Sequence, residues 1–163
     1  MDSYTRDNNT TQYTANDWFA DSTNTTLTFA IPGGNSYVNK GEVPYAWLIN
    51  ARCYGDGNWA TVPQLNLHLF SAANDAGPTD NAACAMVDSD MANCLGIVYF
   101  NNWDAGDDTT GAGGNSFSVA SIAQPILINT DTNCQFYGLV KVKNAFTPLS
   151  AESFYFTLDL ELP

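Results

Sequence analysis

The sequence predicts an all-β fold: an antiparallel β-sandwich, jelly-roll-like, with an extended N-terminal arm. Three observations support this. Apolar and polar residues alternate along several short segments, turn-forming residues separate those segments, and charged residues make up only 13% of the chain. Alternation with a period of two places apolar side chains on one face of a sheet. Asn, Asp, Gly and Pro favour the turns between strands, and nothing indicates alternating strands and helices.

Residues 154–162 form the clearest predicted strand, because Phe154 and Phe156 alternate with Tyr155 and Thr157. Segments with the same alternation are predicted to be half-buried strands. These are residues 26–31 and 65–70. Less regular segments rich in aliphatic and aromatic residues are also predicted to be strands, namely residues 45–54, 95–100, 117–128 and 136–143.

The length of 163 residues suits a single compact domain. We expect residues 22–163 to form the sandwich, with one short helix within residues 81–93. Residues 1–21 are rich in Asn, Thr and Asp and lack regular alternation. They are therefore predicted to form an extended arm or an edge strand.

The charge balance argues against two classes of partner. The chain has 5 Lys and Arg residues against 17 Asp and Glu residues, a formal net charge of −12. Its field repels phosphate backbones and anionic membranes, so we expect neither nucleic acid nor a membrane as a partner. No apolar run is long enough to span a bilayer, and the first residues lack a signal-peptide pattern. Synthesis in a cytoplasm is expected.

The four cysteines are Cys53, Cys84, Cys94 and Cys134. A reducing cytoplasm favours free thiols, and we expect most of them to be buried. The pair that sequence separation favours for a bridge is Cys84 and Cys94, because only a short segment lies between them.

No catalytic or metal-binding constellation stands out. His68 is the only histidine, which excludes a site built from several histidines. A catalytic triad is recognised by geometry, so sequence order does not settle whether His68 belongs to one. Oxygen ligands for calcium are available in two acidic segments, one with Asp88 and Asp90 and the other with Asp104, Asp107 and Asp108. Neither has EF-hand spacing, so solvated acidic loops are the preferred interpretation. We expect a protein that is not an enzyme and has no cofactor.

Tryptophans offer candidate contact residues. Trp47 lies in an apolar run and is predicted to be in the core, whereas Trp59 and Trp103 lie beside turn residues. Exposed aromatics can form a platform for sugars or part of a protein interface. Trp59 and Trp103 are therefore predicted as possible exposed aromatic contacts.

Short motifs follow one another in a specific order. The opening contains Tyr4-Thr5-Arg6, residues 10–17 (TTQYTAND) and Ala20-Asp21-Ser22. The middle contains residues 65–70 (LNLHLF), 78–83 (PTDNAA), 88–90 (DSD) and 95–98 (LGIV). The close contains residues 137–140 (YGLV) and 146–152 (FTPLSAE).

In this order the motifs resemble a family of small proteins from tailed-bacteriophage structural gene clusters, some of which are capsid decoration or cement proteins. The resemblance spans most of the chain. It implies a virion structural protein on the outer capsid surface, synthesised in the host cytoplasm. The implied partners are the major capsid protein and further copies of the chain in a homotrimer. The Gly-rich residues 104–115 and the four cysteines depart from the family pattern. The alternative is a carbohydrate-binding or host-attachment module of a virion.

On this interpretation the N-terminal arm makes the contact with the capsid or with another subunit. An extended arm can add a strand to an exposed sheet edge, with main-chain hydrogen bonds supplying much of the affinity. The residues predicted to make this contact are Tyr4, Arg6, Tyr13, Trp18 and Phe19.

Overall fold

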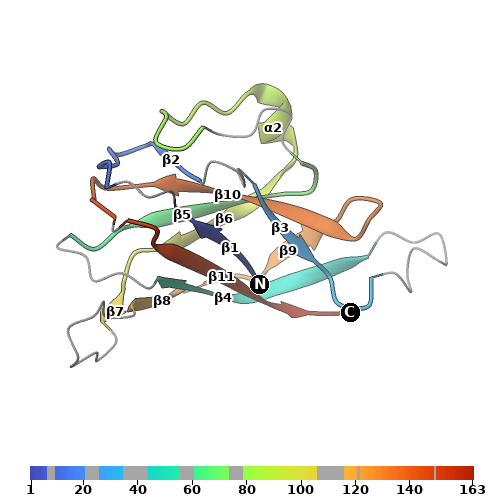
Figure 1. Cartoon of the computed structure of the whole chain (residues 1–163). Coiled ribbons are helices and arrows are strands. Elements are labelled where there is room, and N and C mark those ends of the chain that lie inside the picture. The colour runs from blue at the N-terminus through green and yellow to red at the C-terminus, as the bar shows by residue number, and fades with distance from the viewer. Residues whose placement is uncertain are drawn as a thin grey trace.

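The structure of the chain is a computed structural model. It describes residues 1–6, 10–20, 26–34, 44–55, 61–73, 79–105, 116–120, 122–148 and 150–163. Two antiparallel sheets pack face to face, which confirms the predicted β-sandwich (Figure 1). The jelly-roll order of the strands stays a prediction.

We name each sheet after its central strand. The β4 sheet has the strand order β1-β11-β4-β8-β7, and β9 also pairs with β4. Its strands are β1 (Asp2–Thr5), β4 (Tyr45–Gly55), β7 (Asp104–Ala105), β8 (Ser116–Ala120), β9 (Ile126–Asn129) and β11 (Ser153–Glu161). The β5 sheet has the order β2-β10-β5-β6, and β3 also pairs with β10. Its strands are β2 (Trp18–Phe19), β3 (Leu27–Ala30), β5 (Leu65–Phe70), β6 (Cys94–Phe100) and β10 (Gln135–Val142).

The core lies between the sheets and is built by the alternation that the sequence shows. In β11 the side chains of Phe154 and Phe156 are fully buried, as predicted. In β3, Leu27 and Phe29 are buried while the residues that alternate with them are exposed. Aromatic rings meet across the core, and Phe100 of one sheet contacts Phe156 of the other with ring centroids 5.9 Å apart.

The central strand β5 differs from its prediction, because all of its residues are buried and not only alternate ones. Its outer face is covered by residues 79–93, which contain the predicted short helix, now α2 (Asp88–Ala92). This cover lies above the β5 sheet (Figure 1). Beneath it Trp18, Phe70 and Leu139 form a second, smaller apolar cluster. Strand β5 is thus packed on both sides.

The described part of residues 1–21 is integrated into the sandwich, where β1 and β2 are edge strands of the two sheets, one of the two forms expected for this segment. Tyr4 on β1 pairs with Phe154, and Phe19 on β2 pairs with Val140. Between them, Tyr13 forms an isolated bridge with Phe146. These pairings are too short to show a period in the sequence. Their apolar side chains nevertheless fill the core, which is why the segment does not extend away from it.

All five residues predicted to contact a capsid or another subunit are buried within this chain: Tyr4, Arg6, Tyr13, Trp18 and Phe19. Their role in this structure is to pack the sandwich. Burying them in the core removes more apolar surface from water than an exposed arm would. A contact of these residues with a capsid or another subunit stays a prediction.

The carboxylate of Asp80 fastens this segment to the cover. It lies 3.4 Å from Nη1 of Arg6, and it accepts hydrogen bonds from the hydroxyl of Tyr13 at 2.5 Å and from the backbone N–H of Ala20 at 3.1 Å. The guanidinium of Arg6 also stacks 4.5 Å above the ring of Tyr13. A fully buried guanidinium requires such a partner, because desolvating an uncompensated charge is costly.

Replacing Arg6 with Met should lower the free energy of unfolding by about 3 kcal/mol, the lower end for breaking a buried ion pair, because Asp80 retains some solvent contact. The matched control is Arg52→Met, which breaks the exposed pair between Arg52 and Asp159 and should cost less than about 1 kcal/mol. Urea unfolding of both variants measures the difference. Equal losses would contradict the structural role assigned to Arg6.

Candidate interaction surface

The most distinctive surface of the molecule is the outer face of the β4 sheet. In β4, buried Ala46, Leu48, Ala51 and Cys53 alternate with exposed larger residues. The neighbouring strands add exposed apolar side chains to the same face. We call this surface the aromatic face, with exposed fractions between 36% and 49% for its apolar members: Tyr45, Trp47, Ile49, Tyr54, Phe117, Val119 and Leu127.

Strand register brings these side chains together. At one end of β4, Trp47 lies opposite Leu127 of β9. At the other end, Tyr54 lies opposite Phe117 of β8 on one side and Tyr155 of β11 on the other. The rings of Tyr54 and Tyr155 have centroids 5.7 Å apart. The aromatic face therefore has two apolar ends on one continuous sheet.

A polar group lies between the two ends. Asp159 of β11 accepts a hydrogen bond from the guanidinium of Arg52 at 2.9 Å and one from the side-chain amide of Asn50, also at 2.9 Å. Both partners come from β4, the adjacent strand. Such an exposed pair contributes little to stability but gives the face directional polar groups.

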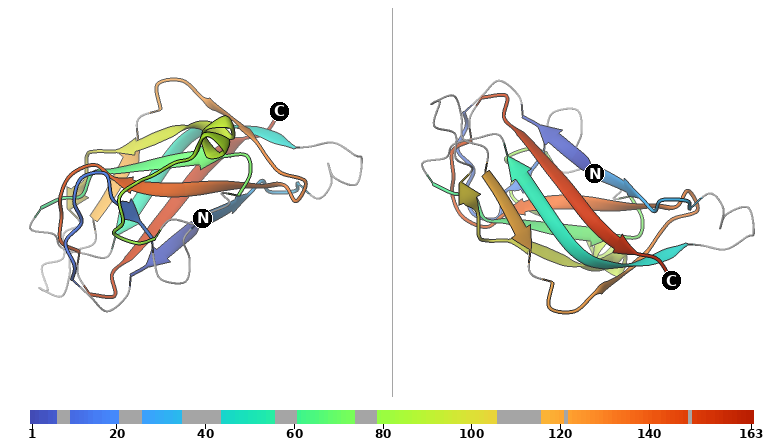
Figure 2. Two further views of the ribbon diagram at one scale, coloured as in Figure 1. Left: turned by 90° about the horizontal axis from the view of Figure 1, so that it is seen from above. Right: turned by 90° about the horizontal axis from the view of Figure 1, so that it is seen from below.

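No described element packs over the aromatic face. In the view from below, β11 and β4 cross the front of the molecule, whereas the view from above has α2 in front of the β5 sheet (Figure 2). The two sides of the sandwich thus differ: residues 79–93 cover part of the β5 sheet, whereas no described element covers the outer face of the β4 sheet. Apolar patches of this kind on otherwise polar proteins commonly mark interaction sites.

Trp47 was predicted to lie in the core, and the structure contradicts this, since 40% of its surface is exposed. The cause is that β4 has apolar residues on both of its faces, so hydropathy does not separate inside from outside. Residue size was the available signal. Small Ala46 and Ala51 face the core, whereas the bulky Tyr45 and Trp47 do not.

Of the two tryptophans predicted as exposed contacts, Trp59 lies outside the described residues. Trp103 is described, and it is half-buried against the core. Its ring meets Phe154 edge-on with centroids 6.4 Å apart. The expectation of an exposed contact at Trp103 is thus corrected, because the indole folds back from its turn onto the sandwich.

His68 is buried on the outer side of β5 beneath the cover, with its ring 6.4 Å from that of Trp18. Burial, and to a smaller extent the positive charge of Lys141, lowers the pKa of His68 from 6.5 to about 4. The imidazole is therefore neutral at pH 7. Its Nε2 atom has no hydrogen-bond partner among the described residues.

The acidic and thiol groups of the described chain form no evident reactive centre. No group of three or more His, Cys, Asp or Glu residues within it is arranged to hold a metal ion. Asp88 and Asp90 belong to the first turn of α2, while Asp107 and Asp108 lie outside the described residues. All four cysteines are thiols. Burial raises the pKa of Cys53, with a further contribution from Glu152, and burial also raises the pKa of Cys84, which disfavours the thiolate form.

The low pKa of His68 predicts a specific pH dependence of stability. Because the unfolded histidine takes up its proton near pH 6.5 and the folded one only near pH 4, the unfolded state gains protons first as the pH falls. The free energy of unfolding should therefore decrease between these values by up to about 3 kcal/mol and lose nothing more through His68 below pH 4. Urea unfolding of the wild type and of His68→Gln isolates this contribution. The same pH dependence in both proteins would contradict the assignment.

Comparisons with known proteins leave the chain without a family assignment. No family model matches it, and neither curated proteins nor solved structures include a match. In the part of the chain that is described, no helix has the length and hydrophobicity needed to cross a bilayer.

Proposed function

We propose that the chain is a structural protein of a virus particle that binds the outer capsid surface and stabilises the shell, as a decoration or cement protein. The observation that carries the proposal is the aromatic face, one exposed apolar surface on a compact acidic sandwich. The ordered resemblance to decoration proteins of tailed bacteriophages supports the same role. The proposed partner is the major capsid protein.

The composition of the aromatic face suits a protein interface. Trp and Tyr supply large apolar areas and are enriched among the residues that dominate binding energy. Trp47 and Tyr54 would supply the anchors at the two ends, and the Arg52–Asp159 pair would supply polar contacts between them. Since the face remains exposed in the isolated chain, its burial contributes free energy only when a partner is present.

Assembly of the chain as a homotrimer would strengthen this attachment. Each copy would bring its own aromatic face to the capsid, and linking several weak contacts raises the overall affinity through effective concentration. The net charge of −12 on each copy disfavours contact with nucleic acid, which suits a protein on the outside of the shell.

A double substitution tests the aromatic face directly. Trp47→Ser combined with Phe117→Ser removes one apolar side chain from each end and should reduce co-sedimentation with purified capsids by about tenfold or more, as loss of an anchor residue does. Both side chains are substantially exposed, so the sandwich should remain folded.

The matched control is Val62→Ser, which removes an apolar side chain that is 46% exposed but does not belong to the aromatic face. This variant should sediment with capsids like the wild type. Mass spectrometry of purified virions should find the chain in a number proportionate to the major capsid protein. Wild-type binding by the double variant would contradict the proposal.

Carbohydrate binding is the second candidate function, and the same face favours it. Tyr45 and Trp47 present aromatic rings on which sugar rings could stack, and the nearby Asn50 and Asp159 offer hydrogen-bonding groups. An apolar platform combined with a few polar groups is typical of small-ligand sites. The ligand would then be a glycan of the host cell surface.

A glycan array separates the two candidates. If the face binds sugars, the wild type should bind particular glycans, and Trp47→Ala should reduce that binding by about tenfold or more because a stacking ring is lost. Val62→Ala provides the control and should bind like the wild type. Absence of binding to every glycan on the array would rule against this second function.

A further inference from the structure

We infer that β6 is an acceptor strand, whose unpaired edge binds an extended segment of a partner protein with alternating apolar residues and neutral or basic character. This site lies on the β5 sheet and is separate from the aromatic face. It therefore goes beyond the proposed function.

The first observation is the open edge of β6. This strand pairs only with β5 among the described residues, so alternate backbone N–H and C=O groups along its other side have no strand to bind. Its seven residues, Cys94–Phe100, include no charged residue and no proline. Edge strands in natural proteins usually carry such residues, because they prevent pairing with other chains. β6 lacks this protection.

The other sheet edges are shorter. The described edge strands β1, β2, β3, β7 and β9 have two to four residues each. β6 is therefore the longest template for strand addition in the described part of the chain. Its register with β5 is regular except for a shift between Leu69 and Phe70, near its first residue.

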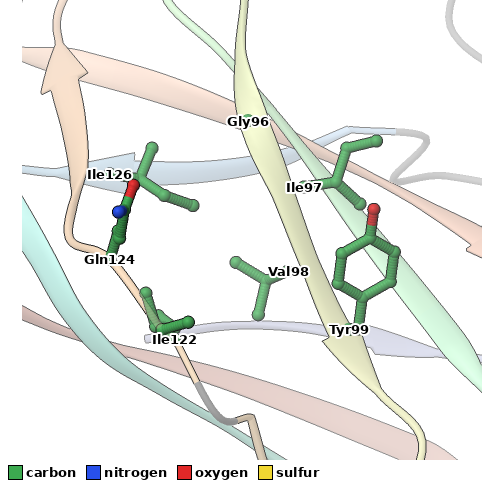
Figure 3. Close-up of a pocket in the computed structure, with 8 residues that line it drawn as sticks. Gly96, Ile97, Val98, Tyr99, Ile122, Gln124 and Ile126 are labelled. Atoms are coloured by element: carbon green, nitrogen blue, oxygen red, sulfur yellow. The ribbon is translucent and has the colours of Figure 1, made fainter.

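The second observation is a hollow beside this edge. It has a volume of about 410 Å³ and is bounded by Gly96 to Tyr99 on one side and by Ile122, Ala123, Gln124 and Ile126 on the other. The close-up shows Val98, Ile122 and Ile126 around the space between the two walls, while Ile97 and Tyr99 point the opposite way (Figure 3). The hollow thus leads from the edge of β6 toward the apolar interior between the two sheets.

Gly96 sets how closely the two walls approach. A Cβ atom at this position would lie only 3.1 Å from Cδ1 and Cγ2 of Ile126. The side chain of Ile126 thus rests against the bare backbone of β6. A strand added to β6 would cover this contact and point every second side chain toward the hollow.

The chemistry of the lining identifies the occupant. The polar groups available are the backbone edge of β6 and the amide of Gln124. Among the residues that bound the hollow only Tyr99 has a titratable side chain, and it points away from the hollow (Figure 3). A regular row of backbone donors and acceptors matches another extended backbone, and the apolar wall matches alternate apolar side chains. This combination is the arrangement by which peptides add a strand to a sheet.

Charge favours a different protein over a second copy as the source of the strand. Each copy of this chain has a net charge of −12, so two copies repel each other, whereas a neutral or basic segment is attracted. The edge strand β6 itself has no charged residue, so it repels neither a second copy nor a basic segment. The occupant is therefore an extended, uncharged or lysine- or arginine-containing segment of a partner protein.

A panel of synthetic peptides tests this inference with the intact chain. Each peptide matches β6 in length, alternates Thr with Val, ends in Lys at both termini, and differs from the others only in its central apolar residue: Ala, Val, Leu or Phe. In NMR titrations, alternate amides of β6 should exchange with solvent about tenfold more slowly when peptide is bound. Replacing the central Ala with Leu should tighten binding by about tenfold or more, because a larger side chain fills the hollow.

Ala123→Trp should weaken peptide binding by about tenfold, because Ala123 is exposed at the hollow and the indole would fill it. Its matched control is Ala92→Trp, at an exposed position in α2. The double variant of the aromatic face should bind the peptides like the wild type, so failure of this inference and failure of capsid binding are distinguishable.

Absence of binding by every peptide, or binding that leaves the β6 amides unprotected, would overturn the inference. Sedimentation that shows dimers joined through β6 would overturn it in favour of a second copy.

Discussion

The charge on Arg6 is buried, and the structure is organised around compensating it. Asp80 supplies the counter-charge and also binds the hydroxyl of Tyr13 and the backbone of Ala20. Because Asp80 belongs to residues 79–93, which cover the outer face of β5, the same carboxylate connects the N-terminal strands to that cover. The position of Trp18 follows, since its backbone exchanges hydrogen bonds with Asn81 and Ala82. The carboxylate of Asp80 thus joins the N-terminal strands, which pack in the core, to the residues that cover β5.

The outer faces of the two sheets differ in how much of them is covered. Strand β5 buries both of its faces, and on the outer side it lies against the apolar cluster around Trp18 and carries the neutral His68. The β4 sheet buries only its inner face, so large apolar side chains remain in contact with water on its outer side. A structural protein that acts by contact needs such a surface, and the acidic surroundings limit association with the wrong partners. The proposed role depends on this asymmetry.

The motifs behind the family resemblance acquire a physical meaning in the fold. Arg6, Tyr13 and Ala20, from the opening motifs, contact the carboxylate of Asp80, which lies in the motif at residues 78–83. The fold thus brings residues of the opening and middle motifs together. The residues of the aromatic face, by contrast, lie outside those motifs. The residues that hold the fold together around Asp80 are thus distinct from those of the aromatic face. Such a separation is common where function is carried by sites placed on a stable fold.

Alternation in β3, β5 and β11 and the turn residues between strands were enough to predict an antiparallel sandwich, because local side-chain period reports directly on burial in a sheet. The sequence also indicated the short helix. Tertiary structure decided the rest. It placed Tyr4, Arg6, Tyr13, Trp18 and Phe19 inside the molecule, since pairings of a few residues leave no period to read. It likewise placed Trp47 outside, because β4 is apolar on both faces and only the position of the second sheet determines which face is core.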